Sequence, residues 1–253
     1  MTRPQDRLID ATIPNHLGVI PDGNRRWAAE VGVSVIDGHR AGFEVAKRLS
    51  RFCRRIGVHT ITVWAFSTEN WRRTPDQVEA LMQIYAEWLN DLLPEAIEED
   101  VRVVHLGRLV GVPEESMQAA AAAGFPDGLP MQLRQSIDDI EAKTCDHVSN
   151  VINLAINYGG EDEMKRAVTK MLASGTPPAA MDIHDFLDTA GQPHPRPDIV
   201  WRTSGEMRSS GFLPLQSAYA EMIFTPKFFP ALSEDDVVDT VLEYSARIRR
   251  FGG

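Results

Sequence analysis

This sequence has few cysteines, no basic excess and no long apolar run. Cys53 and Cys145 are its only cysteines, and they fit neither a disulfide framework nor a metal-site spacing, so we expect a reducing compartment. The chain carries 26 lysines and arginines against 36 aspartates and glutamates, a formal net charge of −10. A surface that follows a nucleic-acid backbone needs a basic excess, so we expect no nucleic-acid partner.

The apolar signals of export and membrane insertion are also missing. No apolar run is long enough to span a bilayer, and residues 1–10 lack the apolar core of a secretory signal. We therefore expect a cytoplasmic protein, while peripheral contact with a membrane stays open because a lipid-like substrate could require it. The 253 residues suffice for one large domain or two small ones with a sizeable core.

The most informative segment runs from His16 to Trp27. His16–Ile20 has the length and β-branching of a short buried strand, and the Ala-rich stretch from Trp27 onward is typical of a helix start. A glycine-containing turn between the two directs backbone N–H groups and the helix dipole toward an anion. Two arginines in that turn favour phosphate, and Asp22 beside them indicates a metal-bridged phosphate. The alternative is a surface turn of ordinary Asn/Gly composition.

Strands and helices alternate along the whole chain. This pattern predicts an α/β protein, a single domain over residues 1–253 with a central, mostly parallel sheet flanked by helices, and residues 1–14 flexible. The expected strands are residues 16–20, 58–66, 101–106, 148–156, 199–201 and 221–224. The expected helices begin at Trp27, cover 38–56, about 75–97 and 113–123, begin again at Asp162, and cover 183–187 and 235–249.

Polar segments follow the expected strands at residues 67–73, 157–160 and 202–210. In open α/β sheets, ligands bind at the carboxyl ends of the strands, so these segments are candidates for one site. The helix after Thr74 carries an apolar stripe from Val78 to Leu92 that fits either core packing or the wall of a ligand tunnel. No GxGxxG or GxxxxGK[ST] motif is present, which leaves little support for a generic nucleotide-binding protein.

Residues 235–239, DDVVD, match the pattern with which helical, trans-type prenyltransferases hold Mg²⁺. Ser233 precedes this run as a helix N-cap, and acidic residues in a first turn are stabilised by the helix dipole. We therefore expect the acidic run to cap a helix rather than to bind a metal.

Seven segments in order carry a family resemblance. They are HLGVIPDGNRRWA at 16–28, GHRAG at 38–42, FSTENWRR at 66–73, INYGG at 156–160, RTSGEMRSSGF at 202–212, AYAEMIF at 218–224 and RRFGG at 249–253. Together they resemble the cis-prenyltransferases, the undecaprenyl-diphosphate-synthase-like family, over nearly all of the chain.

The resemblance implies a homodimeric α/β enzyme that binds two prenyl diphosphates in adjacent sites, drawn from dimethylallyl, geranyl and isopentenyl diphosphates. One substrate is ionised at its allylic C–O bond with the help of Mg²⁺, and the double bond of the other attacks the resulting cation. Fixed donors and a metal ion suit a diphosphate leaving group, and apolar walls keep water from the cation. The C-terminal tail, residues 249–253, resembles a segment that reaches the partner's active site.

The resemblance also assigns residue roles. Catalytic roles fall to Asp22, Asn24, His39, Ser67 and Asn70. Substrate binding falls to Gly23, Arg25, Arg26, Trp27, Arg73, Arg202, Glu206, Arg208 and Ser210. The implied Mg²⁺ ligands are Asp22 and Glu221.

The sequence departs from the family pattern within the site itself. Pro21 stands where the family usually has Met, Arg25 where many members have Gly, and Val35 where a phosphate-binding Arg is usual. The PDGxRRW loop and the FxPL stretch at 212–215 also resemble the irregular, lavandulyl-type branch, which joins dimethylallyl-type units head to middle. These features favour a branched coupling.

The bulky side chains of Trp64, Tyr85 and Trp88 favour a short product. Two alternatives remain: regular head-to-tail addition of isopentenyl diphosphate, and a non-catalytic subunit or prenyl-lipid binder. Such non-catalytic relatives lose the metal carboxylate or the phosphate arginines, whereas this chain keeps Asp22 and Arg202.

Overall fold

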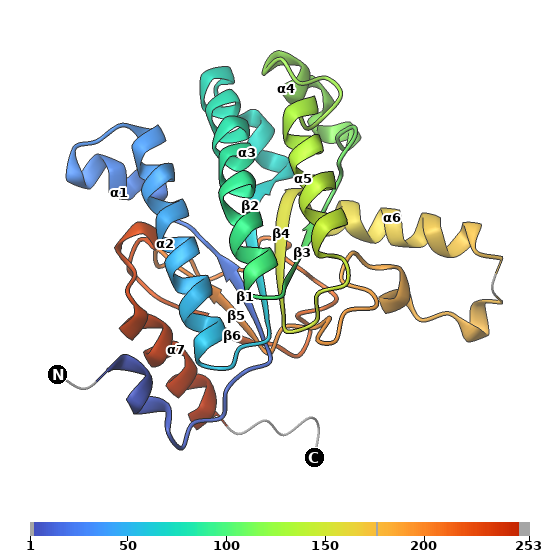
Figure 1. Cartoon of the computed structure of the whole chain (residues 1–253). Coiled ribbons are helices and arrows are strands. Elements are labelled where there is room, and N and C mark those ends of the chain that lie inside the picture. Colours follow the sequence, from blue (N-terminus) through green and yellow to red (C-terminus); the bar gives the residue numbers. More distant parts are fainter. Residues whose placement is uncertain (1–2, 176, 248–253) are drawn as a thin grey trace.

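A six-stranded sheet with the order β3-β4-β2-β1-β5-β6 organises the computed structural model, which describes residues 3–175 and 177–247 (Figure 1). Every strand pair in the described residues is parallel. The strands are β1 (His16–Ile20), β2 (Thr60–Ser67), β3 (Val101–Leu106), β4 (Asn150–Tyr158), β5 (Ile199–Arg202) and β6 (Glu221–Phe224). The predicted α/β fold, with helices around a parallel sheet, is confirmed.

Helices connect the strands. They are α1 (Asn24–Val31), α2 (Val35–Arg55), α3 (Pro75–Glu98), α4 (Met117–Ala122), α5 (Met131–Thr144), α6 (Gly160–Ala173) and α7 (Glu234–Ala246). Short 3₁₀ helices are η1 (Pro4–Leu8), η2 (Thr68–Arg72), η3 (Glu114–Ser116), η4 (Pro178–Ala180), η5 (Ile183–Phe186) and η6 (Phe229–Ala231). Within the described residues, no helix is both long and apolar enough to cross a membrane.

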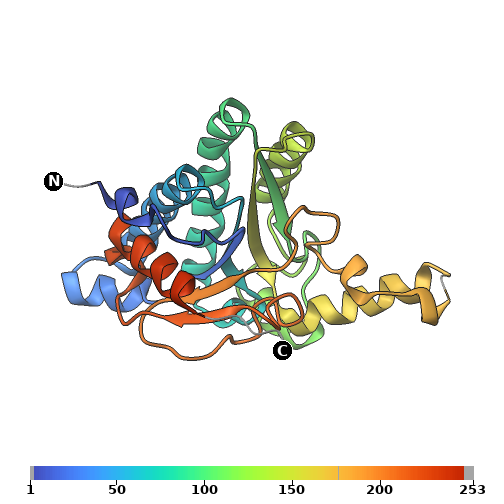
Figure 2. The same cartoon turned by 90° about the horizontal axis from the view of Figure 1, so that it is seen from below.

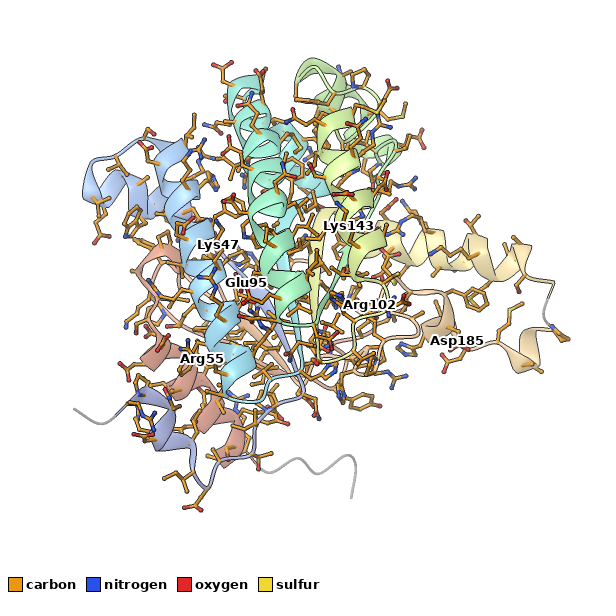
Figure 3. The ribbon with its side chains drawn as sticks, viewed as in Figure 1. Lys47, Arg55, Glu95, Arg102, Lys143 and Asp185 are labelled. Atoms are coloured by element: carbon orange, nitrogen blue, oxygen red, sulfur yellow. The ribbon has the colours of Figure 1, made fainter. Side chains whose placement is uncertain are left out.

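Helices α2, α3 and α5 stand side by side over one face of the sheet (Figure 1). Ser34 caps α2 by accepting a hydrogen bond from the Asp37 amide at 3.1 Å. Ion pairs join α2 to α3: Arg54 donates to Glu95 and Glu99, both at 2.6 Å, and Lys47 lies 3.1 Å from Asp91. Figure 3 labels Lys47 on α2 and Glu95 on α3. The two helices that flank the candidate site therefore hold each other in place.

The two faces of the sheet carry different cores because successive strand residues point to opposite sides. On β2, Ile61 and Val63 join the large helix-side core, whereas Trp64 packs into a smaller cluster on the second face. That smaller cluster consists of Ile20, Leu106, Ala155, Tyr158, Val200, Phe212 and Leu213, with Trp64, Val104, Ala220 and Met222 packed against it. Beyond the sheet, α6 and the segment that returns from it project outward (Figure 2).

A buried polar ladder crosses the second face near the amino ends of the strands. The His16 ring lies 2.8 Å from the His194 carbonyl oxygen and 2.7 Å from the Thr62 hydroxyl. Asn153 donates to Thr62 Oγ1 at 3.0 Å and exchanges two hydrogen bonds of 2.9 Å with Gln192. All four of these side chains are at most 7 % exposed, and each has hydrogen-bond partners within the ladder.

Helix α5 differs from the sequence expectations: it was not predicted, although Leu133, Ile137 and Ile140 recur at helical spacing and are buried. The segment 3–14 packs against α7: Leu8 is buried, and the Thr12 amide donates to the Ser245 hydroxyl at 2.8 Å. The expected flexibility of residues 1–14 stays a prediction.

The DDVVD run lies in the first turns of α7, as expected of a cap. Asp236 accepts from the amide and the hydroxyl of Ser233, both at 2.8 Å, and pairs with Lys227 at 2.6 Å. Arg7 pairs with Asp235 and Asp239. All three carboxylates are thus engaged in capping or ion pairs.

Candidate active site

Two adjoining cavities open at the carboxyl ends of the central strands. The first, of about 420 Å³, extends between α2, α3 and the ends of β1, β2 and β5. The second, of about 550 Å³, lies over the start of α1. Both are lined by Pro21, Asp22, Asn24, His39 and Arg73, so the segment after β1 forms their common wall.

The turn between β1 and α1 depends on Gly23. This residue is the N-cap of α1 with φ +100°, and a Cβ there would lie 2.7 Å from the Phe228 ring. Only glycine fits such a left-handed, crowded position. The Asp22 carbonyl accepts from the Phe229 amide at 3.0 Å and from the Thr203 hydroxyl at 2.6 Å. The first-turn amides of α1 have no acceptor within the helix, so they are available to an anion.

Two glycines on α2 allow α1 to approach closely. A Cβ at Gly38 would lie 2.6 Å from the Asn24 carbonyl oxygen, and one at Gly42 would collide with Asn24 Oδ1. The Asn24 side-chain amide donates to the Pro21 carbonyl at 3.2 Å, while its buried Oδ1 has no hydrogen-bond partner. The GHRAG motif therefore seats Asn24 and its loop against α2.

Arginines from two distant segments meet around shared carboxylates. Arg202 Nη2 lies 3.0 Å from Asp22 Oδ2, and Arg26 Nη2 lies 3.6 Å from Asp22 Oδ1. Glu206 forms ion pairs with both Arg26, at 3.2 Å, and Arg208, at 2.7 Å. Three guanidiniums are thus linked through two carboxylates, and guanidiniums suit diphosphate oxygens.

The loop after β5 is held in an irregular conformation. Arg202 Nη1 donates to the Ser210 hydroxyl at 2.8 Å and to the Arg208 carbonyl at 2.6 Å, and the Arg202 side chain is only 7 % exposed. Ser204 and Ser210 adopt positive φ angles of +75° and +52°, which are uncommon for residues other than glycine. These hydrogen bonds aim the guanidinium of Arg202 into the first cavity, which both it and Ser210 line.

His39 is a neutral group at neutral pH. Burial, followed by the charges of Arg73 and Arg25, lowers the pKa of His39 from 6.5 to about 4. Burial is also the main reason that the pKa of Arg73 lies below its usual value. A neutral imidazole beside two guanidiniums can exchange hydrogen bonds with a phosphate without adding charge.

Ser67 and Asn70 line the first cavity at the end of β2. The Ser67 amide donates to Asn70 Oδ1 at 3.2 Å, so the start of η2 holds both polar side chains in one turn.

Two aromatic walls bound the first cavity. On the helix side, the Phe43 ring centroid lies 5.2 Å from that of Tyr85 and 5.5 Å from that of Trp88. On the second face, Trp64 stacks on Phe212 with centroids 5.2 Å apart and an interplanar angle of 18°. The apolar stripe of α3 belongs to the helix-side core, and two of its members, Tyr85 and Trp88, also line the first cavity, whereas Val78, Leu81 and Leu89 do not.

Most of the predicted site residues gather at this edge. The first cavity is lined by Asp22, Asn24, His39, Ser67, Asn70, Arg73, Arg202 and Ser210. The second adds Gly23, Arg25 and Arg26, while Glu206 and Arg208 join through ion pairs. Trp27 lines neither cavity. Thr203 and Phe229, which fix the Asp22 backbone, were missed. Thr203 lies in the RTSGE motif, but no sequence signal marks Phe229.

Glu221 lies away from this group. Within the sheet it is level with Ile199 and Leu17, whereas Asp22 follows Ile20 at the opposite end of β1. Leu17 and Ile20 are three residues apart along β1, which is roughly 10 Å. The two strand spacings between β6 and β1 add roughly 10 Å across the sheet. Within one chain, Asp22 and Glu221 therefore lie apart, and their shared role as Mg²⁺ ligands stays a prediction. Glu221 instead pairs with Arg247 at 2.7 Å.

No cluster of three or more His, Cys, Asp or Glu side chains suited to a metal occurs in the described part of the chain. Mg²⁺ commonly binds through one or two carboxylates together with substrate phosphates and water. Asp22 fits that mode, because its carboxylate is one-third exposed and lines both cavities. The predicted tail segment, residues 249–253, lies outside the described residues.

Comparisons with known proteins point to one family. The family model described as putative undecaprenyl diphosphate synthase matches residues 20–126 and 120–252. An isoprenyl transferase of Listeria innocua is 36% identical over 251 residues, covering 96% of this chain and 92% of its own length. The isoprenyl transferase of Bacillus subtilis is 33% identical, covering 98% and 91%.

Two solved structures are similar in fold. Lavandulyl diphosphate synthase from Lavandula x intermedia, in complex with dimethylallyl diphosphate, has a TM-score of 0.84 and 30% identity, covering 95% of this chain and 99% of that one. A probable undecaprenyl diphosphate synthase from Campylobacter jejuni has a TM-score of 0.74 and 25% identity, covering 96% and 100%.

Proposed function

The chain belongs to the undecaprenyl diphosphate synthase family of cis-prenyltransferases, and on this premise we propose that it joins two short prenyl diphosphates head to middle, with dimethylallyl diphosphate as one substrate. Membership of the family makes the protein a prenyltransferase of isoprenoid biosynthesis. The type of coupling and the length of the substrates are the proposed part.

The observation that carries the proposal of short substrates is the small volume of the first cavity. Its volume of about 420 Å³ lies toward the lower end of the range for small-molecule pockets. A chain of eleven prenyl units has 55 carbons and, at roughly 10–15 Å³ of cavity volume per water-sized group, would need about 550–825 Å³. The rings of Phe43, Tyr85 and Trp88 contact one another where a longer chain would have to pass. Tyr85 is held there by its 2.6 Å hydrogen bond to the Ala65 carbonyl.

The polar groups divide between the two substrates. The donor's diphosphate would bind the first-turn amides of α1, the Arg26 guanidinium and neutral His39. The acceptor's diphosphate would bind Arg202, Arg208 and Ser210. Asp22 and Glu206 take only some of the five N–H donors of each guanidinium, so donors remain for the diphosphate oxygens.

The reaction breaks the donor's allylic C1–O bond, and the bonding pair leaves with the diphosphate. The acceptor's double bond supplies the pair for the new C–C bond, and loss of a proton restores a double bond. The released diphosphate is the nearest acceptor for that proton, since His39 has a pKa of about 4 and is a weak base. Aromatic rings and Ile20 exclude water from the cation.

We propose Mg²⁺ as the cofactor, held by Asp22 together with diphosphate oxygens and water. When bound, it would neutralise charge on the leaving diphosphate.

We also propose that the enzyme is a cytoplasmic homodimer. Met207 and Tyr219 are 77% and 73% exposed, and they flank the segment that carries Arg208 and Ser210. Large apolar side chains beside a ligand loop suit coverage by a second copy of this chain.

Product analysis tests the coupling. The purified protein is incubated with Mg²⁺ and dimethylallyl diphosphate alone, with dimethylallyl plus isopentenyl diphosphate, and with geranyl plus isopentenyl diphosphate. The products are dephosphorylated and identified by gas chromatography and mass spectrometry. We expect a branched ten-carbon alcohol from dimethylallyl diphosphate alone. Linear Z-prenols that appear only with isopentenyl diphosphate would refute head-to-middle coupling.

Regular head-to-tail synthesis is the second candidate. The isoprenyl transferases similar to this chain at 33–36% identity favour it. A non-catalytic role is disfavoured, because the arginines and Asp22 remain gathered at one cavity; it would be accepted if none of the three incubations released diphosphate.

A further inference from the structure

We propose that Trp64 limits the chain length of the acceptor substrate, independently of the donor, whose chain meets Trp88. This inference rests on the proposed function in that it assumes two prenyl diphosphates bound side by side. It states which side chain limits the chain length of which substrate.

Strand register places Trp64 in line with the acceptor's diphosphate site. Val19 is the partner of Val63, so the next residues, Ile20 and Trp64, stand beside each other on the second face of the sheet. Ile20 is also the partner of Arg202 on its other side. The three side chains therefore form a row across β2, β1 and β5, and all three line the first cavity.

The length of this row suits a five-carbon chain. Two strand spacings separate Trp64 from Arg202, roughly 10 Å. A diphosphate at Arg202 and Ser210 uses part of that span, and what remains lies over Ile20. A dimethylallyl group fits there, whereas a geranyl group, twice as long, would run into the indole.

Trp64 is fixed where it stands. Its indole Nε1 donates to the Tyr158 carbonyl at 3.2 Å, and its ring stacks on Phe212, which is completely buried. The Tyr158 ring contacts it edge-on with centroids 6.2 Å apart. An indole covered by Phe212 on one face, yet still partly exposed in the cavity, is a rigid stop rather than a side chain that swings away.

Trp88 belongs to the opposite wall. It comes from α3 and contacts Phe43 of α2, so it lies on the helix side of the sheet, while Trp64 lies on the second face. No aromatic contact joins the two groups of rings within the described residues. Enlarging one wall should therefore leave the other substrate's limit unchanged.

The test uses substrates that act only as acceptors. Thiolodiphosphates, in which sulfur replaces the bridging oxygen, resist ionisation at carbon and so cannot serve as donors. Dimethylallyl diphosphate is the donor, and dimethylallyl and geranyl thiolodiphosphates compete as acceptors. Mass spectrometry of the intact, sulfur-containing products gives the ratio of ten- to fifteen-carbon products and leaves out the sulfur-free product that dimethylallyl diphosphate forms with itself. We expect the wild type to prefer the short acceptor at least tenfold, and Trp64→Ala to bring the ratio within about threefold of unity.

Trp88→Ala is the matched control. It should keep the wild-type acceptor ratio while raising the use of geranyl diphosphate as donor. Trp64→Phe, which preserves an aromatic stack, covers the case in which the alanine variant does not fold, and it should shift the acceptor ratio in the same direction by a smaller factor. An unchanged acceptor ratio in folded Trp64 variants, or an equal shift in Trp88→Ala, would overturn the proposal.

Failure of the proposed function gives a different result. In that case the wild type couples no dimethylallyl units to each other and uses isopentenyl diphosphate instead. The same comparison is then made with isopentenyl diphosphate and a homologue extended by one prenyl unit as the competing acceptors, and the ratio in the Trp64 and Trp88 variants decides the inference as before.

Discussion

Strand β1 begins in one polar cluster and ends in another, and the two clusters are built in opposite ways. His16, at its start, belongs to the buried ladder with Thr62, Asn153 and Gln192, all neutral groups that hydrogen-bond to one another. Asp22, just beyond its end, lies among Arg202 and other arginines whose charges face two cavities.

The difference separates a structural from a functional use of polar residues. A ladder in which the hydrogen-bonding groups satisfy one another stabilises the sheet and leaves nothing for a ligand. In the active-site cluster, three arginines share two carboxylates, Asp22 and Glu206, so guanidinium donors remain for incoming phosphate oxygens. Burial alone does not distinguish the clusters; charge and access to a cavity do.

The largest expected effect is loss of turnover in Asp22→Asn. The amide keeps the shape but neither carries the charge that a metal ion requires nor balances Arg202. We expect kcat to fall about 1,000-fold or more, equivalent to about 4 kcal/mol, measured as diphosphate release with Mg²⁺. Asn153→Ala in the ladder is the control: it should lower the melting temperature and leave kcat within about threefold. A comparable loss of kcat in both variants would dissolve the distinction between the clusters.

A smaller effect is expected from acid on the ladder. Burial lowers the pKa of His16 from 6.5 to about 4, so the unfolded chain binds a proton there more readily than the folded protein does. The stability due to neutral His16 is complete above pH 6.5 and is lost as the pH falls through about 4. The loss amounts to about 3 kcal/mol for this group.

Urea unfolding between pH 7 and 4 measures this effect. His39 and His105 contribute in the same direction, because burial also lowers the pKa of each to about 4. Asp198 lies close enough to His16 to oppose part of its shift. The comparison is therefore between wild type and His16→Asn, whose stability should fall less steeply over this range. Parallel curves would show that the ladder does not depend on a neutral His16.

The smallest effect is expected from Glu206→Gln. Glu206 aligns Arg26 and Arg208 without reaching into either cavity. Its loss should therefore leave these two arginines present but less well positioned to bind diphosphate. We expect kcat/KM to fall about tenfold, or about 1.4 kcal/mol, mainly through KM. Glu243→Gln, which breaks an ion pair with Arg247 away from the cavities, should leave both constants unchanged. A loss as large as that of Asp22→Asn would mean that Glu206 acts in the chemistry itself.

Much of the site was predictable because local sequence encodes it. The turn at Gly23 and the strand before it follow from composition and spacing, and Val101–Leu106 matches its expected strand at both ends. Helix α5 was not predicted although its apolar residues recur at helical spacing, because no helix start was recognised after the turn-rich connection that precedes it. The predicted pairing of Asp22 with Glu221 as metal ligands came from the family resemblance, which gives no strand register, and the register of one chain places the two residues apart.

The sequence alone determined that an anion-binding turn follows β1, that strands alternate with helices, and that bulky aromatic residues stand near the ends of strands. These properties depend on neighbours within a few residues. Tertiary structure decided which distant groups meet. Asp22 and Arg202 are 180 positions apart and pair because β1 and β5 run parallel with Ile20 beside Arg202. The same register places Glu221 at the amino end of β6, away from Asp22. It also places Trp64 on the second face of the sheet, opposite the helix side where Trp88 lies, because one position along a strand decides the face that a side chain occupies.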